Sequence, residues 1–172
     1  MSLEKASVPV CGIRNIAAVD VAEFTARGYV CKMMGTAEKG EDGISAYVQP
    51  ILVPNGEPAA AVPMNYNLIS MVGSNSGPRS LFGQGAGRYP TAYNVMQDCV
   101  DVKKGIGFYS AYGEKVAANN DVLKQYYVRG GNLDADLVAE AWGEGVLTKA
   151  VSVSAMHAWL KDNPAAFIAA LA

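Results

Sequence analysis

A glycine-rich segment with the sequence Gly-Gln-Gly-Ala-Gly-Arg-Tyr-Pro-Thr-Ala occupies residues 83–92 and is called the glycine segment below. It follows a short apolar stretch and runs directly into a predicted helix that starts at Pro90 or Thr91. The first backbone N–H groups of a helix lack intrahelical partners and carry a partial positive charge, so the preceding loop can receive an anion. Glycine allows close backbone approach to a ligand, and proline suits a first helical turn. The segment is a candidate ligand site, although such glycines also serve simply to turn a strand into a helix.

Other residue types with metal-binding or nucleophilic chemistry are sparse. Cys11, Cys31 and Cys99 are odd in number and widely separated, which argues against a disulfide framework and a structural zinc site. We expect them to be buried thiols. The single histidine, His157, has no partner at metal-ligand spacing, so a position on a helix face is favoured over a ligand role. We therefore predict no metal site and no catalytic residue in this group.

The helix after the glycine segment has an apolar stripe that predicts packing against the rest of the protein. Met96 in this stripe is interpreted as a gap-filling packing residue and not as a cofactor contact. Asp98 and Asp101 fall elsewhere on the helix, where a solvated face is favoured over a catalytic pair. The stripe consists of Ala92, Val95, Met96, Cys99 and Val100.

Composition limits the class of protein. The chain has 172 residues, of which 51% are hydrophobic, enough for one good core or two small ones. No apolar run reaches the roughly 18 residues of a membrane span, and the start does not resemble a secretion signal. We expect a cytoplasmic protein without a membrane partner. The net charge of -2 and the scattered Lys and Arg residues argue against nucleic acid as a partner.

Turn and capping signals predict the elements that position the glycine segment. Asp20 as an N-cap and Glu23 three residues later predict a helix over residues 21–27, which Gly28 ends. Pro50 cannot donate to a strand ladder, which favours an edge position or a bulge for its strand. The predicted strands cover residues 29–37, 44–53, 66–72 and 79–82.

The pattern changes after Gly105, where we place a boundary between domains at residues 1–105 and 106–172. An aromatic run at residues 108–112 opens the second domain. Its predicted order is β-α-β-α-α. The elements are a strand over residues 125–129, a helix over 133–142, a strand over 146–153, a helix capped by Ser154, and a last helix that begins at Asn163-Pro164.

A run of particular residues in this order resembles the catalytic domain of homoserine dehydrogenase. The run extends from Gly12 to Val102, over half of the chain. Its most specific part is the glycine segment, where Pro-Thr-Ala follows the last glycine and Asp98 comes seven residues after Thr91. The matching residues are Gly12-Ile13, Asp20-Val21, Gly28-Tyr29, Lys32-Met33-Met34, Val48-Gln49-Pro50, Asn67 and Gly83-x-Gly85-Ala86-Gly87-x-x-Pro90-Thr91-Ala92-x-x-Val95-x-x-Asp98.

The resemblance implies the fold and the chemistry of an NAD(P)-dependent oxidoreductase of threonine and methionine biosynthesis. Such enzymes interconvert aspartate semialdehyde and homoserine by hydride transfer, and their catalytic domain also forms the dimer interface. By this resemblance Gly87 is cofactor-binding, with Gly85, Ala86 and Thr91 as secondary candidates. The expected fold class is α+β: a mixed, largely antiparallel sheet with helices on one face and a small α/β tail. We expect a homodimer that pairs through sheet edges such as residues 79–82 or 44–53.

The departures from the family are equally informative. The sequence contains neither the Gly-x-Gly-x-x-Gly turn of a Rossmann domain nor the family's acidic residue and Asp-x-x-x-Lys helix. Lys32 is not their substitute, because in the family a lysine here lies in a strand. The simplest interpretation is a C-terminal portion of such an enzyme, inactive as an isolated chain and without tight cofactor binding of its own. NAD and NADP are not distinguished.

Two other interpretations stay open. Residues 126–129 resemble the opening strand of an ACT module, a ligand-binding domain that responds to threonine. The tail is then a reduced ACT-like unit, or else an unrelated cap. A freestanding module that binds an amino-acid effector is therefore an alternative function, and a plain dimerisation scaffold is another.

Overall fold

The computed structural model describes residues 2–40, 43–107 and 113–172. The chain divides into two compact units. The first unit combines Met1–Gly56 with Tyr112–Ala172, and the second unit is Glu57–Ala111. The first unit thus contains both ends of the chain. A domain boundary at residue 105 stays a prediction, and the aromatic run at 108–112 lies outside the described residues.

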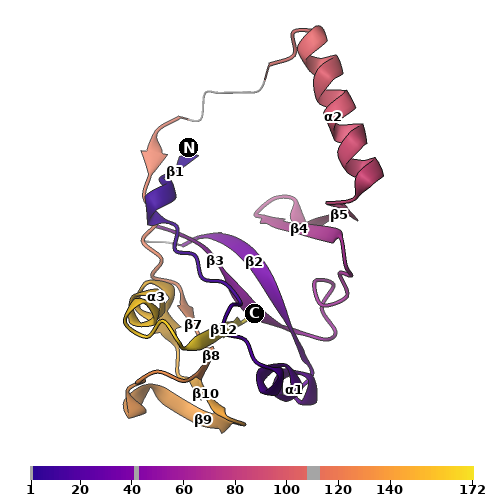
Figure 1. Ribbon diagram of the computed structural model, residues 1–172. Helices are drawn as coiled ribbons and strands as arrows, with labels where there is room; N and C mark the ends of the chain where they lie inside the picture. The colour runs from indigo at the N-terminus through magenta and orange to yellow at the C-terminus, as the bar shows by residue number, and fades with distance from the viewer. Residues whose placement is uncertain (1, 41–42, 108–112) are drawn as a thin grey trace. The chain divides into compact units, whose positions relative to one another are not determined.

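The first unit is built on a six-stranded sheet with the order β2-β3-β12-β8-β10-β9. Neighbouring strands are antiparallel except for the pair β3 and β12, which is parallel. Figure 1 shows the last strand of the chain, β12, lying beside β8 and β3. The strands are β2 (Tyr29–Lys39), β3 (Ile44–Pro54), β8 (Tyr126–Arg129), β9 (Val138–Trp142), β10 (Gly145–Thr148) and β12 (Phe167–Leu171).

Two helices cover this sheet, and short elements complete the first unit. The helices are α1 (Ala18–Ala26) and α3 (Val153–Asp162). Two-residue strands form two further pairs: β1 (Ser2–Leu3) with β6 (Lys115–Val116), and β7 (Leu123–Lys124) with β11 (Val151–Ser152). The 3-10 helices are η1 (Lys5–Ser7) and η2 (Ala135–Leu137).

The core of the first unit lies on both faces of the sheet. Alternate residues of a strand point to opposite faces, and the two buried clusters divide β12 in this way. One cluster combines Phe24 of α1 with Phe167, and the other combines Met156 of α3 with Ile168. The α+β class with a mixed, largely antiparallel sheet is confirmed. Helices α1 and α3 pack against opposite-facing side chains, so the helix of the tail covers the other face of the sheet from α1.

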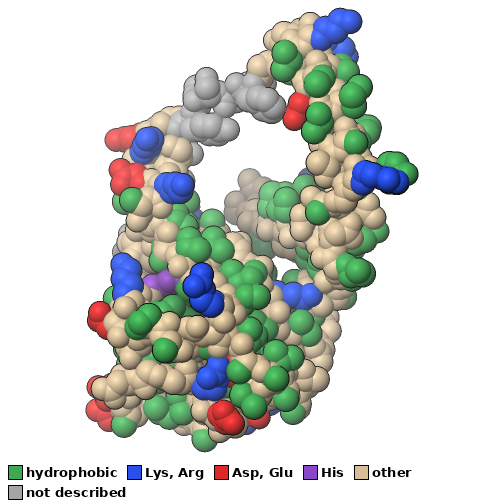
Figure 2. All heavy atoms as spheres, viewed as in Figure 1, with side chains coloured by type: hydrophobic (Ala, Val, Ile, Leu, Met, Phe, Trp, Pro, Cys, Tyr) green, Lys and Arg blue, Asp and Glu red, His purple; other side chains and the backbone are tan. Residues whose placement is uncertain are grey.

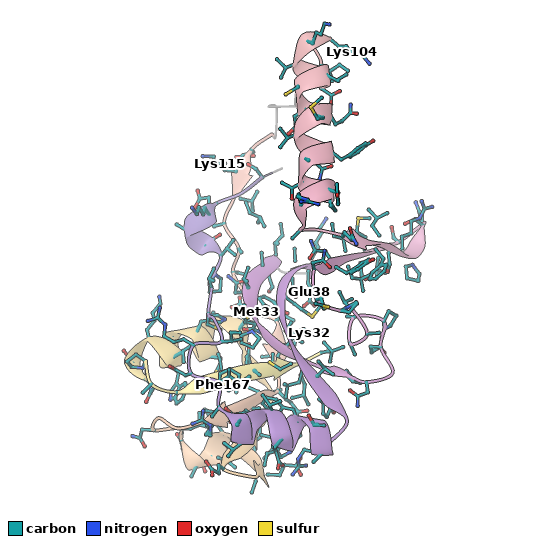
Figure 3. The ribbon with its side chains drawn as sticks, turned by 45° about the vertical axis from the view of Figure 1, so that its right-hand side comes forward. Lys32, Met33, Glu38, Lys104, Lys115 and Phe167 are labelled. Atoms are coloured by element: carbon teal, nitrogen blue, oxygen red, sulfur yellow. The ribbon has the colours of Figure 1, made fainter. Side chains whose placement is uncertain are left out.

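The second unit consists of a hairpin and a long helix. The strands β4 (Tyr66–Gly73) and β5 (Gly77–Gln84) pair over eight residues, from Tyr66 opposite Gln84 to Gly73 opposite Gly77. The helix α2 (Arg88–Lys103) follows, with Lys104 labelled at its C-terminal end in Figure 3. The predicted strands and helix are confirmed here, with the helix starting two residues earlier than Pro90.

The apolar stripe of α2 is exposed instead of packed. No residue of α2 is buried against the described residues, and Val95 and Met96 are 55% and 64% exposed. Cys99 is exposed too, so the expectation of a buried thiol is wrong for this residue. Figure 2 shows hydrophobic side chains over the visible face of this helix. Within the second unit, the hairpin does not bury the apolar stripe of α2.

The tail of the chain differs most from the prediction. Residues 133–142 form a 3-10 turn and strand β9 instead of a helix, and residues 167–171 form the inner strand β12 instead of a last helix. Residues 167–171 are short and apolar, and periodicity alone does not separate a buried strand from a buried helix at this length. Residues 133–142 include three acids, and their apolar residues fit either a helix or a strand. In the tail, β8, β9, β10 and β12 belong to the same sheet as β2 and β3.

Local capping and strand position also differ from the prediction. Helix α1 begins at Ala18, so Asp20 is its third residue, and the Asp20 carboxylate accepts from the Ala17 N–H at 2.7 Å. Helix α3 is capped by Ser152, whose hydroxyl accepts from Ala155 N, and not by Ser154. Pro50 lies in an inner strand, where it faces Met33 of the edge strand β2. The expectation that residues 44–53 form a sheet edge is therefore wrong.

Candidate functional site

The glycine segment forms the connection between β5 and α2. Gly87 is the N-cap of α2 and has φ 124° and ψ 157°. Residues with a Cβ rarely adopt this backbone conformation, because it lies in a φ/ψ region that is essentially restricted to glycine. Position 87 therefore requires glycine because of the backbone conformation there. The three residues 85–87 connect strand β5 to helix α2.

The start of α2 is accessible. No side chain among the described residues caps this helix, and every residue from Arg79 to Tyr89 is exposed. Thr91 N donates to Gly87 O at 3.0 Å, which closes the first helical turn. An uncapped helix N-terminus presents N–H donors and a partial positive charge to whatever lies in front of it. The geometry is that of a surface which can accept a polar or anionic group.

Two asparagines, one directly before β4 and one within it, contact the glycine segment. Asn65 Nδ2 donates to Ala86 O at 2.7 Å, and Asn65 O accepts from Gly85 N at 2.9 Å. The Asn67 amide fills the space above Gly85, where a Cβ would collide with it. Sequence reasoning missed Asn65, and Asn67 entered only as one of the residues that resemble the family. The signal that could have found them is the place of both asparagines at the start of the first hairpin strand, whose partner strand leads into the glycine segment.

Aromatic stacking fixes the hairpin below the segment. The rings of Tyr66 and Phe82 are stacked with centroids 5.0 Å apart, and Gln84 Nε2 donates to the Tyr66 hydroxyl at 3.2 Å. At the other end of the segment, the Arg88 guanidinium lies over the Tyr89 ring and donates to its hydroxyl at 2.7 Å. These contacts hold both ends of the glycine segment.

The four predicted binding residues lie together in this segment. Gly85, Ala86 and Gly87 form the turn, and Thr91 lies one helical turn further on. Asp98 is exposed on the same helix, and Asp101 accepts a hydrogen bond from Gln97 at 2.8 Å. The interpretation of these two acids as a polar helix face agrees with that placement. Lys32 lies in β2, as Figure 3 shows, within a regular strand.

The single histidine is a buried part of the first unit. His157 lies on α3, is 6% exposed, and its Nε2 pairs with Gln49 Oε1 at 2.8 Å. Burial, together with the charge of Lys161, lowers the pKa of His157 to about 4. Because Gln49 Oε1 only accepts, Nε2 carries the proton of the neutral ring. The described residues contain no group of three or more His, Cys, Asp or Glu side chains that could hold a metal ion.

Two of the three thiols are partly buried and poorly suited to nucleophilic chemistry. Burial raises the pKa of Cys11 to about 11, and burial together with the charge of Asp20 raises the pKa of Cys31 to about 11. A thiol with so high a pKa is protonated near neutral pH, and the thiolate is the reactive form. These cysteines therefore act as packing residues.

A buried ionic cluster joins α1 to the sheet. The Asp20 carboxylate is fully buried and accepts from Arg129 and from the Tyr127 hydroxyl, the latter at 2.7 Å. Burial would raise the pKa of Asp20, but its bonds with Arg129, Ala17 and Tyr127 hold it below its usual value. All lone pairs of this acid are engaged, so its role is structural. The exposed glycine segment is thus the candidate site that remains.

The known proteins that this chain resembles belong to one class, the dehydrogenases. Residues 1–100 match the sequence profile of homoserine dehydrogenase. This match covers more than half of the chain, and the chain belongs to the homoserine dehydrogenase family.

Individual relatives agree with this assignment. The chain is 31% identical over 137 residues to homoserine dehydrogenase of Bacillus subtilis, which corresponds to 75% of this chain and 32% of that protein. It is 34% identical over 114 residues to homoserine dehydrogenase of Corynebacterium glutamicum, which corresponds to 63% of this chain and 26% of that protein. The chain therefore spans about a third or less of the length of these relatives.

Solved structures show the same fold. A homoserine dehydrogenase from Thiobacillus denitrificans has a TM-score of 0.65 at 23% identity, over 94% of this chain and 46% of that one. The Staphylococcus aureus homoserine dehydrogenase has a TM-score of 0.61 at 17% identity, over 99% of this chain and 48% of that one. The tail is included in these matches, so its strand-rich arrangement is shared with these proteins.

Proposed function

We propose that this chain is the catalytic and dimerising portion of a homoserine dehydrogenase, which interconverts aspartate semialdehyde and homoserine with NAD(P) in amino-acid biosynthesis. The observation that carries the proposal is the glycine segment, where an uncapped helix start follows a turn that only glycine adopts at position 87. Family membership supports this reading of the segment. The substrate is accordingly a small amino acid or its aldehyde, and the cytoplasm is the expected location.

The glycine segment fits one end of a nicotinamide cofactor. Gly85, Ala86 and Gly87 present main chain without bulky side chains, and α2 directs its N-terminus to the same place. Thr91 lies one turn behind them. These residues would hold the nicotinamide end of the cofactor, which supplies the hydride chemistry when bound. The backbone of this chain positions that end and keeps polar donors beside it.

The pyrophosphate and ribose of the cofactor need a further segment. In Rossmann folds a parallel strand leads through a glycine turn into a helix that binds the pyrophosphate. Here the strand before the glycines belongs to an antiparallel hairpin, so this architecture is not the one that precedes α2. We therefore expect the isolated chain to bind the cofactor weakly and to be inactive.

An assay of aspartate semialdehyde reduction by NADPH tests this proposal. The isolated 172-residue chain should give no turnover, and the same chain joined behind a dinucleotide-binding domain of the family should be active. A Gly87→Ala variant of the joined protein should lose most of that activity, while Gly83→Ala serves as the matched control. Turnover by the isolated chain would contradict the expected inactivity, and an inactive joined protein that is folded would contradict the enzyme assignment.

The exposed apolar surface of the second unit supports a homodimer. On the hairpin Leu81 and Phe82 are about as exposed as Val95 and Met96 are on α2. Apolar patches of this kind mark surfaces that another protein covers. Among the described residues, β4 and β5 pair only with each other, so each strand of the hairpin has one unpaired edge. A second copy of the chain that pairs along these elements would cover both features, as a two-fold interface does.

A further inference from the structure

Asn65, directly before β4, and Asn67, within β4, contact the glycine segment in a way that fixes its shape. Asn65 uses both its side chain and its main chain: Nδ2 donates to Ala86 O at 2.7 Å, and its carbonyl accepts from Gly85 N at 2.9 Å. The regular ladder of the hairpin ends at Tyr66 opposite Gln84. Asn65 therefore extends the pairing by one residue beyond the ladder, into the turn itself.

The side chain of Asn67 occupies space that the glycines leave open. Asn67 pairs with Gly83, and a Cβ on Gly85 would collide with the Asn67 amide. Asn65 lies in the turn directly before β4 and Asn67 lies within β4, and their side-chain amides approach the glycine segment at Ala86 and at Gly85, respectively. The absent side chain at Gly85 is what allows the Asn67 amide to lie against the turn.

The glycine-rich turn needs contacts that keep it in one conformation. Gly87 is held at φ 124° and ψ 157°, and the position of a Cβ there lies 3.4 Å from Asn65 Nδ2. A glycine-rich turn loses more conformational entropy on ordering than other residues do, so it stays ordered only when contacts fix it. The hydrogen bond from Asn65 to the Ala86 carbonyl fixes the peptide directly before Gly87.

From these contacts we infer that Asn65, with Asn67 beside it, is a positioning residue that holds the glycine segment in the shape that receives the nicotinamide end of the cofactor. The inference rests on the proposed function for the identity of that ligand. The role in shaping the turn rests on the contacts alone. Asn65 acts through Ala86 and Gly87 and is not itself a catalytic residue.

The test uses the ¹⁵N-labelled 172-residue chain and three variants. Asn65→Ala removes the donor, and Asn65→Asp keeps the size but places an oxygen against the Ala86 carbonyl. Asn94→Ala is the matched control, because Asn94 is exposed on α2 away from the turn. Two quantities are measured: the hydrogen-exchange rate of the Gly85 amide without ligand, and the shifts of the Gly87 and Arg88 amides during titration with NADP⁺.

The expected result is faster exchange at Gly85 in both Asn65 variants. Loss of one hydrogen bond corresponds to a change of about 2- to 10-fold, both in this exchange rate and in the dissociation constant for NADP⁺. Asn65→Asp should show the larger change, and Asn94→Ala should match the wild type. Urea unfolding of each variant, followed separately by the amide signals of the two units, shows whether the hairpin is folded when the turn is measured.

The outcomes separate the two proposals. Unchanged Gly85 exchange and an unchanged NADP⁺ constant in folded Asn65→Ala would overturn the positioning role and leave the proposed function standing. A wild-type chain whose Gly87 and Arg88 amides do not respond to NADP⁺ would instead contradict the placement of the cofactor. In that case the exchange rates would still decide whether Asn65 shapes the turn.

Discussion

Asp20 and Arg129 form a two-point ion pair across the first unit, with Arg129 Nε donating to Asp20 Oδ1 at 2.6 Å and Nη2 to Oδ2 at 2.9 Å. The two residues are 109 positions apart in the sequence. Arg129 Nη2 also donates to Asn15 O at 2.8 Å, and the Asn15 side chain donates to Pro164 O and Ala166 O. The pair therefore ties the start of α1 to β8 and to the residues before β12.

Removal of this arginine should destabilise the first unit strongly. Arg129→Ala leaves the fully buried Asp20 carboxylate without its charged partner, and breaking a buried ion pair costs about 3–5 kcal/mol. Because Arg129 is partly exposed, water can replace part of the contact, and we expect the lower end of that range. Urea unfolding at neutral pH measures the change.

The exposed pair of Arg27 and Glu23, four residues apart on α1, is the control for that experiment. Arg27→Ala should cost less than Arg129→Ala, because exposed pairs contribute only about 0.3–0.5 kcal/mol. Arg27 also lies over the Trp142 ring, which adds a modest loss of packing. Equal losses in the two variants would contradict the assignment of a special role to Asp20 and Arg129.

The stability of the first unit should fall in mild acid because of His157. In the folded state its pKa is lowered to about 4, against an ordinary value of 6.5. Between these values the unfolded chain binds a proton that the folded chain does not, so stability decreases as the pH falls from about 6.5 to 4. The full effect is on the order of 3 kcal/mol. Urea midpoints between pH 7.5 and pH 4.5, in steps of about half a unit, would follow it.

The matched variant for this measurement is His157→Gln, which keeps a hydrogen-bonding side chain beside Gln49 but does not titrate. Its stability should change much less over the same pH range. Asp20 affects stability at lower pH than His157 does. Its pKa is lowered in the folded state, so its stabilising effect is lost only as the pH falls below the unfolded pKa of 3.8. A steep loss of stability near pH 6 that persists in His157→Gln would show that another group is responsible.

Gly87 should tolerate substitution by alanine less well than Gly83 does. Gly87→Ala forces a Cβ into φ 124° and ψ 157°, at a cost of about 1–3 kcal/mol, or displaces the start of α2. A Cβ added at Gly83 would meet no heavy atom within 4 Å, and φ of Gly83 is not positive, so Gly83→Ala should be nearly neutral. Helix content by circular dichroism and thermal unfolding compare the two variants.

The apolar face of α2 should be needed for self-association. Met96→Glu places a charge on this face, and a buried side chain of this size contributes about 1.5–3 kcal/mol, so the dimer should dissociate about 10-fold more readily or more. Asn94→Glu adds the same charge about 200° away around the helix and should have little effect. Sedimentation equilibrium of both variants gives the dissociation constants. A wild-type chain that stays monomeric at high concentration would contradict the proposed homodimer.

Local signals account for the parts of the fold that the sequence predicted well. Alternation and a charged turn predicted β2 and β3, and the glycines with Pro90 predicted the turn into α2. The candidate binding residues, Gly85, Ala86, Gly87 and Thr91, follow from the same local pattern and its family resemblance. Such patterns depend on neighbours in the chain, so one sequence is enough to read them.

The sequence by itself determined the strands before Gly56, the hairpin, the glycine turn and the amphipathic helix, because these follow from turn residues, capping and side-chain period. Only the tertiary structure decided that Phe167–Leu171 is a strand between β3 and β8, and that Asn65 contacts Ala86. A short apolar run fits a helix or a strand equally well, and its partners are distant in the chain. The choice was made by the hydrogen bonds and buried surface that an inner strand gains from two neighbours, β3 and β8.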